Sequence, residues 1–364
     1  MERREFLKSS AAVSALSVLP AAAFAASDPV AFDPRPGAWR SFDVTTRVEI
    51  AQPQGVNQAW IPLPSFRARD WIRPGQSAWT TNGQAKEVRA GGASLLHVTW
   101  AAGMAPAVEV TSRVATRDRA IDLGKPGQAP ALSDAERKRF TAATAYIPTD
   151  GIVRETALKA AAGAKTDLDK ARAVYEWVVA NTWRNPKTRG CGTGDVAFLL
   201  KSGDLGGKCA DLNGLYVGMV RALGIPARDL YGIRVAPSSF GFKALGAGSE
   251  VITKAQHCRA EVWLEGYGWV PADPADVRKV VLEEPPGNLA IDDPKVAAAH
   301  KTLFGAWETN WIAYNDGHDV ALPGAHEKPI AFLMYPQGMT GAGALDCLEA
   351  DAFKYTITSK PVAA

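Results

Sequence analysis

Apolar residues recur at two spacings along the chain, and the first of these is the spacing of strands. Three segments alternate apolar and polar side chains, at 42–50, 95–100 and 108–114. Turn-forming residues separate them, at 53–55, 82–83 and 91–92. We therefore expect a small antiparallel β domain over residues 27–130, most simply a β-sandwich.

The second spacing is helical, and it is clearest in the run that begins at Cys209. Apolar side chains then recur every three or four positions, at Leu212, Leu215, Tyr216, Met219, Val220 and Leu223. Gly224 and Pro226 supply the stop signals expected just past a helix end. Cys209 is therefore expected at or near the first turn of a helix.

A helix start changes the chemistry of a cysteine. Its partial positive charge stabilises a thiolate, which is the nucleophilic form, and so lowers the thiol pKa. Gly206 and Gly207 before Cys209 would let the backbone enter tightly and leave room for a substrate. The alternative interpretation, a buried structural cysteine on a core helix, is equally consistent with this stretch alone.

A loop precedes this helix and is expected to share a cleft with it. Thr166 and Asp169 form a capping-box pattern ahead of a helix that ends near Asn181. Residues 184–194 are polar and rich in glycine, so they are predicted to be a loop leading toward Cys209.

His257 lies in the second informative segment, a predicted strand followed by a hairpin. Alternation over 257–265 places His257 on one face and Cys258 on the other, toward the core. A two-residue turn would set His257 opposite Asp276, whereas a contact with Asp273 needs a bulge. Either carboxylate could fix the imidazole tautomer and stabilise imidazolium, and His257 alone could equally be a structural strand residue.

As a set, these residues resemble the core of the transglutaminase-like superfamily of cysteine enzymes. The resemblance rests on Cys209 at a helix start, His257 on a later strand, and the pattern Trp269-x-x-x-Asp273-Pro274, with 223–228 as the helix end. It covers roughly residues 150–280. It implies an α+β fold with a papain-like core, in which the nucleophile helix packs on an antiparallel sheet.

The resemblance also implies roles for the residues. Cys209 would be the nucleophile, His257 the base and Asp273 the orienting acid, because Asp273 stands four residues after Trp269 and precedes proline. An aromatic residue upstream of the cysteine often completes the oxyanion hole in such enzymes, and Trp183 is better placed for this than Trp177. The implied domains are a catalytic unit over 131–280 and a C-terminal extension over 281–364 packed on the core.

The first 26 residues resemble an export signal. Arg3-Arg4 precede an apolar run of small residues, and Ala23-Phe24-Ala25 forms a cleavage-site pattern. The paired arginines are typical of the twin-arginine route. We therefore expect a bacterial periplasmic or secreted protein with no membrane span after cleavage.

Composition and residue spacing limit the classes of partner and cofactor that we expect. The chain of 364 residues is 47% hydrophobic and 22% charged with a net charge of +3, which gives no reason to expect a nucleic-acid partner. No cysteine or histidine spacing indicates a metal site, and no cofactor is expected. A pair among Cys191, Cys258 and Cys347 could form a disulfide in an oxidising compartment.

The predicted function is cysteine-dependent acyl transfer on a peptide or protein substrate, for example in the cell envelope. A Cys209 thioester would form at a peptide or side-chain amide, and hydrolysis is favoured over transfer to an amine. Two alternatives remain: a cross-linking transglutaminase, or a catalytically silent binding or scaffold protein. A redox function is disfavoured because no second cysteine stands near Cys209 in the sequence.

Overall fold

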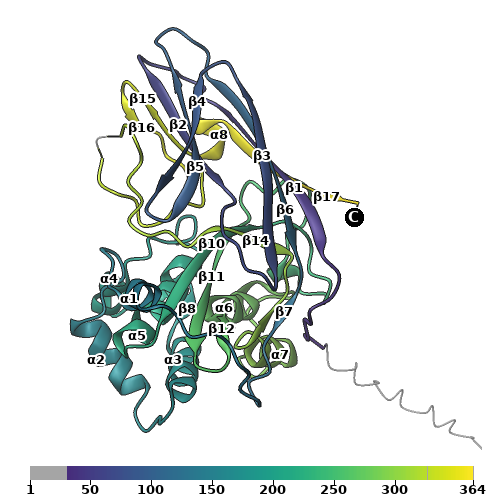
Figure 1. Cartoon of the computed structure of the whole chain (residues 1–364), viewed down its shortest axis with the longest axis vertical. Coiled ribbons are helices and arrows are strands. Elements are labelled where there is room, and N and C mark those ends of the chain that lie inside the picture. The colour runs from purple at the N-terminus through teal and green to yellow at the C-terminus, as the bar shows by residue number, and fades with distance from the viewer. Residues whose placement is uncertain (1–30, 326, 364) are drawn as a thin grey trace, which may run out of the picture.

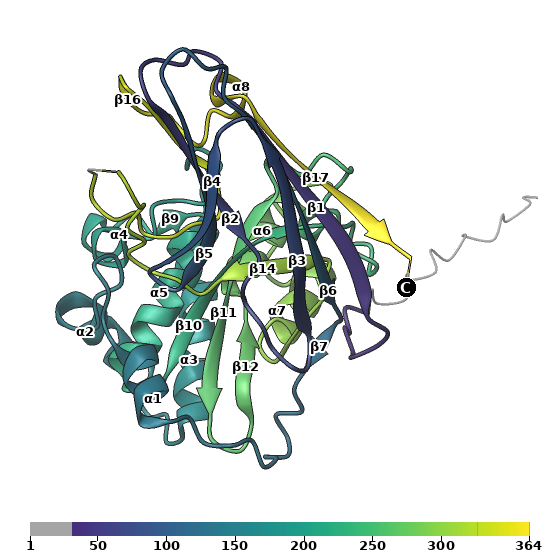
Figure 2. The same ribbon diagram turned by 45° about the horizontal axis from the view of Figure 1, so that its top comes forward.

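The computed structural model describes residues 31–325 and 327–363. The predicted export signal at residues 1–26 lies outside the described residues. Figures 1 and 2 show a strand-rich layer above a unit of helices packed around a central sheet.

Two antiparallel sheets make up the strand-rich part. The first has the order β17 (Tyr355–Val362), β1 (Arg40–Glu49), β6 (Ala107–Thr116) and β3 (Ile72–Thr81). The second has the order β16 (Gly343–Ala344), β15 (Gln337–Thr340), β2 (Asn57–Leu63), β5 (Ala93–Trp100) and β4 (Gln84–Ala90). Burial alternates along β1 and β6, as the sequence pattern predicts for strands with one face in a core.

The C-terminal segment supplies strands both to the strand-rich part and to the central sheet of the helical unit. β17 pairs with β1, β15 pairs with β2, and β14 (Trp311–Asn315) pairs with β10 (Ala227–Arg234) of the central sheet. β13 (Ala306–Trp307) also pairs with β7 (Arg119–Ala120). The extension expected over 281–364 therefore does more than pack on the core, because it supplies strands to four sheets. Strand pairing between such distant segments leaves no local signal in the sequence.

The central sheet has the antiparallel order β12 (Gly268–Ala272), β11 (Gln256–Leu264), β10 (Ala227–Arg234) and β14. Helix α5 (Cys209–Ala222) packs on β10 and β11, and every one of its residues is buried. The helices around α5 are α2 (Gly151–Ala160), α3 (Asp167–Asn181), α4 (Val196–Ser202) and α6 (Pro274–Glu283). A nucleophile helix packed on an antiparallel sheet confirms the predicted α+β fold.

The remaining elements are short. They are β7 (Arg119–Ala120), α1 (Asp134–Thr141), β8 (Trp183–Arg184), β9 (Gly206–Gly207), the 3-10 turn η1 (Lys243–Leu245), α7 (Pro294–Thr302), β13 (Ala306–Trp307) and α8 (Ala350–Phe353).

Capping residues explain where two of the helices begin. Thr166 and Asp169 form the predicted capping box of α3. Ser133 and Glu136 form a second box that starts α1, a helix that the sequence analysis did not identify. α5 ends as predicted, since Gly224 adopts a positive φ of 80° that favours glycine.

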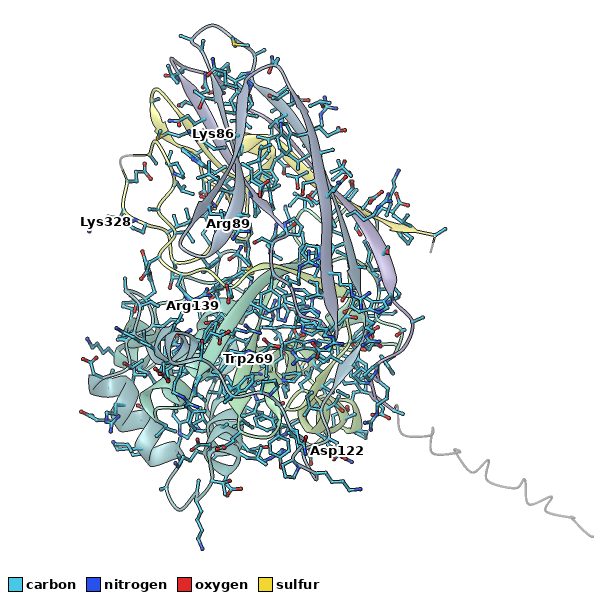
Figure 3. All side chains as sticks on the ribbon, viewed as in Figure 1. Lys86, Arg89, Asp122, Arg139, Trp269 and Lys328 are labelled. Atoms are coloured by element: carbon cyan, nitrogen blue, oxygen red, sulfur yellow. The ribbon has the colours of Figure 1, made fainter. Side chains whose placement is uncertain are left out.

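Aromatic side chains bind the layers together. Trp71 of the strand-rich part stacks on Trp311 of the central sheet, with ring centroids 6.0 Å apart. Figure 3 places Trp269 of β12 in the lower unit and Lys86 of β4 in the strand-rich layer. The Arg228 guanidinium lies 3.8 Å from the centroid of the Trp269 ring.

Within the described residues, no helix has the length and apolar character needed to cross a bilayer.

Candidate active site

Cys209 is the first residue of α5 and is only 3% exposed. The Asp211 carboxylate fixes this helix start, because it accepts hydrogen bonds from the backbone N–H groups of Lys208, Thr193 and Gly194, each at 3.0 Å. The Ala210 N–H donates to the Cys191 carbonyl at 2.9 Å. The predicted loop over 184–194 is thereby held beside the nucleophile helix.

The two glycines before Cys209 serve packing. A Cβ on Gly206 would lie 2.3 Å from the Trp183 ring, and a Cβ on Gly207 would lie 2.6 Å from Asp211. The space that the sequence analysis assigned to substrate is occupied by these two side chains. Any larger residue at either position would displace the strand that leads into α5.

The hairpin that carries His257 has a register different from the predicted one. Leu264 pairs with Gly268, so three residues form the turn where the sequence analysis assumed two. β12 ends at Ala272, and Asp273 is instead the N-cap of α6. The contact between His257 and Asp273 therefore needs no bulge, since Asp273 has already left the strand.

His257 and Asp273 are in direct contact. His257 Nε2 lies 2.8 Å from Asp273 Oδ2, and both side chains are buried. The other carboxylate oxygen, Oδ1, accepts hydrogen bonds from Asn213 Nδ2 and from the Asp276 N–H, both at 3.1 Å. Asn213 also donates to the Cys258 carbonyl at 2.8 Å, so it links α5 and β11 to α6. Asp273 is thus fixed from three elements.

Asp276 also reaches His257, although the transglutaminase-like pattern selected Asp273 as its partner. Its Oδ2 lies 3.3 Å from His257 Nε2, and its Oδ1 lies 2.6 Å from Arg234 Nη2. Arg259 Nε lies 3.3 Å from Asp273 Oδ2. The reason is the first turn of α6, which brings residues 273 and 276 to the same side. Both carboxylates named by the sequence analysis therefore meet His257.

This environment changes the pKa values of the catalytic pair. Burial opposes charge on His257, but the carboxylates of Asp276 and Asp273 outweigh it and raise its pKa to about 10. Burial likewise raises the pKa of Cys209, yet hydrogen bonds from Cys191, Cys258 and His257 bring it well below its usual value. The site therefore favours a thiolate–imidazolium pair.

His257, Asp273 and Asp276 could each present one ligand atom to a metal ion, since these atoms lie within 4.8 Å of one another. Arg234 and Arg259, however, already neutralise the two carboxylates. A divalent cation placed there would be repelled by both guanidinium groups. The donor set fits a network of ion pairs better than it fits a metal site.

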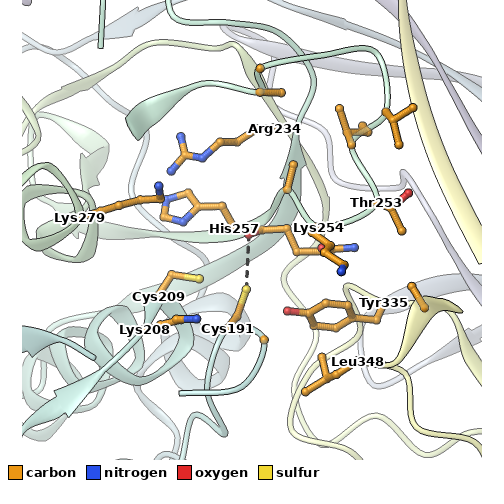
Figure 4. Close-up of a pocket in the computed structure, with 18 of the residues that line it drawn as sticks. Cys191, Lys208, Cys209, Arg234, Thr253, Lys254, His257, Lys279, Tyr335 and Leu348 are labelled. Carbon is orange, nitrogen blue, oxygen red and sulfur yellow. Dashed lines mark hydrogen bonds between the residues drawn. The ribbon is translucent and has the colours of Figure 1, made fainter. Parts of the chain in front are cut away.

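A cavity of about 540 Å³ opens at Cys209 and His257 (Figure 4). One wall comes from the helical unit and the other from the C-terminal segment, which contributes Tyr335, Leu348, Ala350 and Tyr355. Of the loop over 237–248, only the small residues 246–248 reach the cavity, because Phe242 and Leu245 are packed inward.

Two further cysteines lie beside Cys209. Cys191 lines the cavity, and its thiol donates to the Gln256 carbonyl at 3.4 Å (Figure 4). Cys258 is fully buried, and both Cys191 and Cys258 help to lower the pKa of the Cys209 thiol. All four cysteines are free thiols, so the disulfide considered for Cys191, Cys258 and Cys347 is not formed. Cys209 therefore has cysteine neighbours in three dimensions, which the sequence did not indicate, because the fold brings together residues distant in sequence.

Trp183 is not brought to the cavity. Its indole N–H donates to Asp204 at 3.0 Å, and its ring covers Gly206. The side chains at the site that the sequence analysis did not assign include Arg234 and Arg259, which pair with the two carboxylates, and also Asn213, Gln256 and Tyr335. Gln256 directly precedes His257, and Asn213 lies one helical turn after Cys209. Their positions in the sequence could therefore have identified both as candidate site residues.

Comparisons with known proteins concern the family and the fold of the chain. Residues 154–274 match the model of the transglutaminase-like superfamily. An uncharacterized protein of Haemophilus influenzae is 33% identical over 339 residues, which cover 88% of this chain and 91% of that protein.

Solved structures are more distant. A "putative cysteine protease" from Cytophaga hutchinsonii shares the fold with a TM-score of 0.51 at 15% identity, over 90% of this chain and 99% of its own. The periplasmic domain of TgpA from Pseudomonas aeruginosa aligns with a TM-score of 0.38 at 18% identity, over 70% of this chain and 75% of its own. The fold and the matched core together support a cysteine-dependent enzyme, and the chain belongs to the transglutaminase-like superfamily.

Proposed function

We propose that this protein is an exported cysteine-dependent enzyme of acyl transfer that hydrolyses peptide or side-chain amides. One observation carries the proposal: Cys209 and His257 line the same cavity. Cys209 is the first residue of a buried helix, and His257 is held by Asp273. The pattern of residues 1–26 supports export.

The first half-reaction would form a thioester. The Cys209 thiolate attacks the amide carbonyl carbon, and the electrons of the carbonyl bond move onto oxygen. The backbone N–H of Cys209 has no intrahelical acceptor at a helix start, so it is a natural donor to this oxyanion. His257 then gives its proton to the departing amine as the C–N bond breaks.

The second half-reaction would release the acid. Neutral His257 takes a proton from water, the hydroxide formed attacks the thioester carbonyl, and the C–S bond breaks to return the thiolate. Nε2 of His257 is engaged by Asp273, which leaves Nδ1 for these transfers. Asp273 keeps the ring in this orientation and stabilises imidazolium.

Hydrolysis is favoured over amine transfer because of the charges in the cavity wall. Arg184, Lys208, Arg234, Lys254 and Lys279 line the cavity together with one carboxylate, Glu283. A lysine-like acyl acceptor approaches as an ammonium and would be repelled by this wall. Water carries no such penalty, and the small residues at 246–248 are a poor shield against it.

The test offers glutamine-containing and peptide substrates with and without a labelled primary amine. We expect deamidated or cleaved product in both cases and little label incorporated. Efficient incorporation at micromolar amine, with little hydrolysis, would identify a cross-linking transglutaminase instead. A stable, correctly folded protein without turnover of any substrate, and without labelling of Cys209 by an electrophile, would support the scaffold alternative.

A further inference from the structure

The cavity beside Cys209 carries an excess of positive charge that the proposed chemistry does not use. Five of its lining side chains are cationic, and one is a carboxylate: Arg184, Lys208, Arg234, Lys254, Lys279 and Glu283. The Cys209 thiolate and the His257 imidazolium offset each other, so they do not change this balance.

Some of these cations already have partners. Arg234 contacts Asp276 at 2.6 Å, while Arg184 and Lys279 share the carboxylate of Glu283. Lys208 and Lys254 differ, because within residues 31–325 and 327–363 neither ammonium forms an ion pair. Two flexible cations therefore face the cavity without a counter-charge.

A second feature at the same wall is an unpartnered buried amide. Gln256 is 9% exposed and lines the cavity. Its Nε2 has no hydrogen-bond acceptor among the residues that the structure describes. A buried donor without an acceptor is destabilising, and a ligand oxygen that accepts from it removes this cost. Its Nε2 atom is enclosed in the structure, so this amide serves a ligand only when the side chain turns toward the cavity.

From these observations we infer that the cavity selects acyl donors that carry a carboxylate close to the scissile amide. Lys208 and Lys254 bind this carboxylate, and Gln256 adds a third donor when its amide turns toward the cavity. A carboxylate is an anion that only accepts hydrogen bonds, so it matches two ammonium groups and one amide donor. The inference rests on the proposed function, since it names the substrate class of the same site.

The experiment compares matched peptides. One pair carries glutamate or glutamine beside the scissile amide, with the C-terminus amidated in both. A second pair has neutral side chains and ends in a free carboxylate or in an amide. These arms distinguish a side-chain carboxylate from a terminal one. We expect kcat/KM to favour the acidic member of at least one pair by about tenfold or more, mainly through KM, and the preference to weaken as salt rises.

Three variants test whether this preference depends on the side chains that line the cavity. In Lys208→Gln and Lys254→Gln the acidic preference, measured as the ratio of kcat/KM for the two members of a pair, is expected to fall by roughly three- to tenfold each. Gln256→Glu should weaken the preference, because it adds a negative charge at the same cavity wall. Lys201→Gln is the matched control, since Lys201 is exposed on α4 and does not line the cavity.

Equal turnover of the acidic and neutral members of both pairs by the wild-type protein would overturn the inference while leaving the proposed hydrolysis intact. So would a preference that survives in all three variants. A variant that slows acidic and neutral peptides equally would show that the lysine activates Cys209 instead of binding substrate, and this too contradicts the inference. Failure of the proposed function is recognised separately, by no turnover of any peptide and no electrophilic labelling of Cys209.

Discussion

The two sides of the cavity differ in how their charges are compensated. On the buried side, each charge has an opposite charge in contact: His257 with Asp273, and Arg234 with Asp276. At the rim, Lys208 and Lys254 have no carboxylate partner among the described residues. Buried, paired charges are expensive to separate, whereas exposed charges act through a weak, screened field. Substitutions on the buried side should therefore change kcat or folding, and substitutions at the rim should change KM.

The largest effect is expected from Cys209→Ala, which removes the nucleophile. Hydrolysis should fall at least about 10³-fold, because no other group at the site can form the thioester. The measurement is peptide turnover, together with mass spectrometry after limited iodoacetamide treatment of the wild-type protein. Label on Cys347 with Cys209 untouched would contradict the assignment, since burial raises the pKa of Cys347.

The next largest effect separates the two carboxylates of the buried side. Asp273→Asn should lower kcat by roughly 10²- to 10⁴-fold, because His257 loses the partner that orients it. Asp276→Asn should chiefly destabilise the fold, by roughly 3–5 kcal/mol, because Arg234 is left buried without its counter-charge. Kinetics and chemical denaturation of both variants measure the difference. The opposite pattern would make Asp276 the orienting residue.

The pH dependence reports the same network. Activity requires thiolate and imidazolium together, so it should rise as the thiol ionises below its usual pKa and fall above the His257 pKa of about 10. The raised pKa of His257 contributes stability that is complete below its unfolded value and is lost as pH rises through about 10. In Asp276→Asn the alkaline limb of the pH–activity profile should move to lower pH, because the loss of this negative charge lowers the pKa of His257. A limb that stays in place would show that Asp276 does not act on His257.

The smallest effect is expected from Trp183→Phe. The indole N–H is bonded to Asp204 and the ring covers Gly206, so turnover should stay within about threefold of wild type. Steady-state kinetics test this, with thermal unfolding as the control for packing. A loss of a hundredfold in kcat without destabilisation would restore Trp183 as an oxyanion donor.

The sequence by itself determined the local features of this site. The α5 helix with Cys209 at its start, the capping box of α3 and the β11 strand that carries His257 all follow from spacing and end signals. Such signals can be read because the residues that cause them lie within one or two turns of each other. The family pattern then selected Asp273 as the partner of His257.

The tertiary structure alone decided which distant groups meet. The turn between β11 and β12 has three residues instead of two, and the first turn of α6 brings Asp276 to His257 beside Asp273. The loop over 184–194 brings Cys191 to the Cys209 thiol, and β17 pairs with β1 at the edge of a sheet. These contacts depend on backbone register and strand pairing between remote segments, which side-chain periodicity along the chain does not encode.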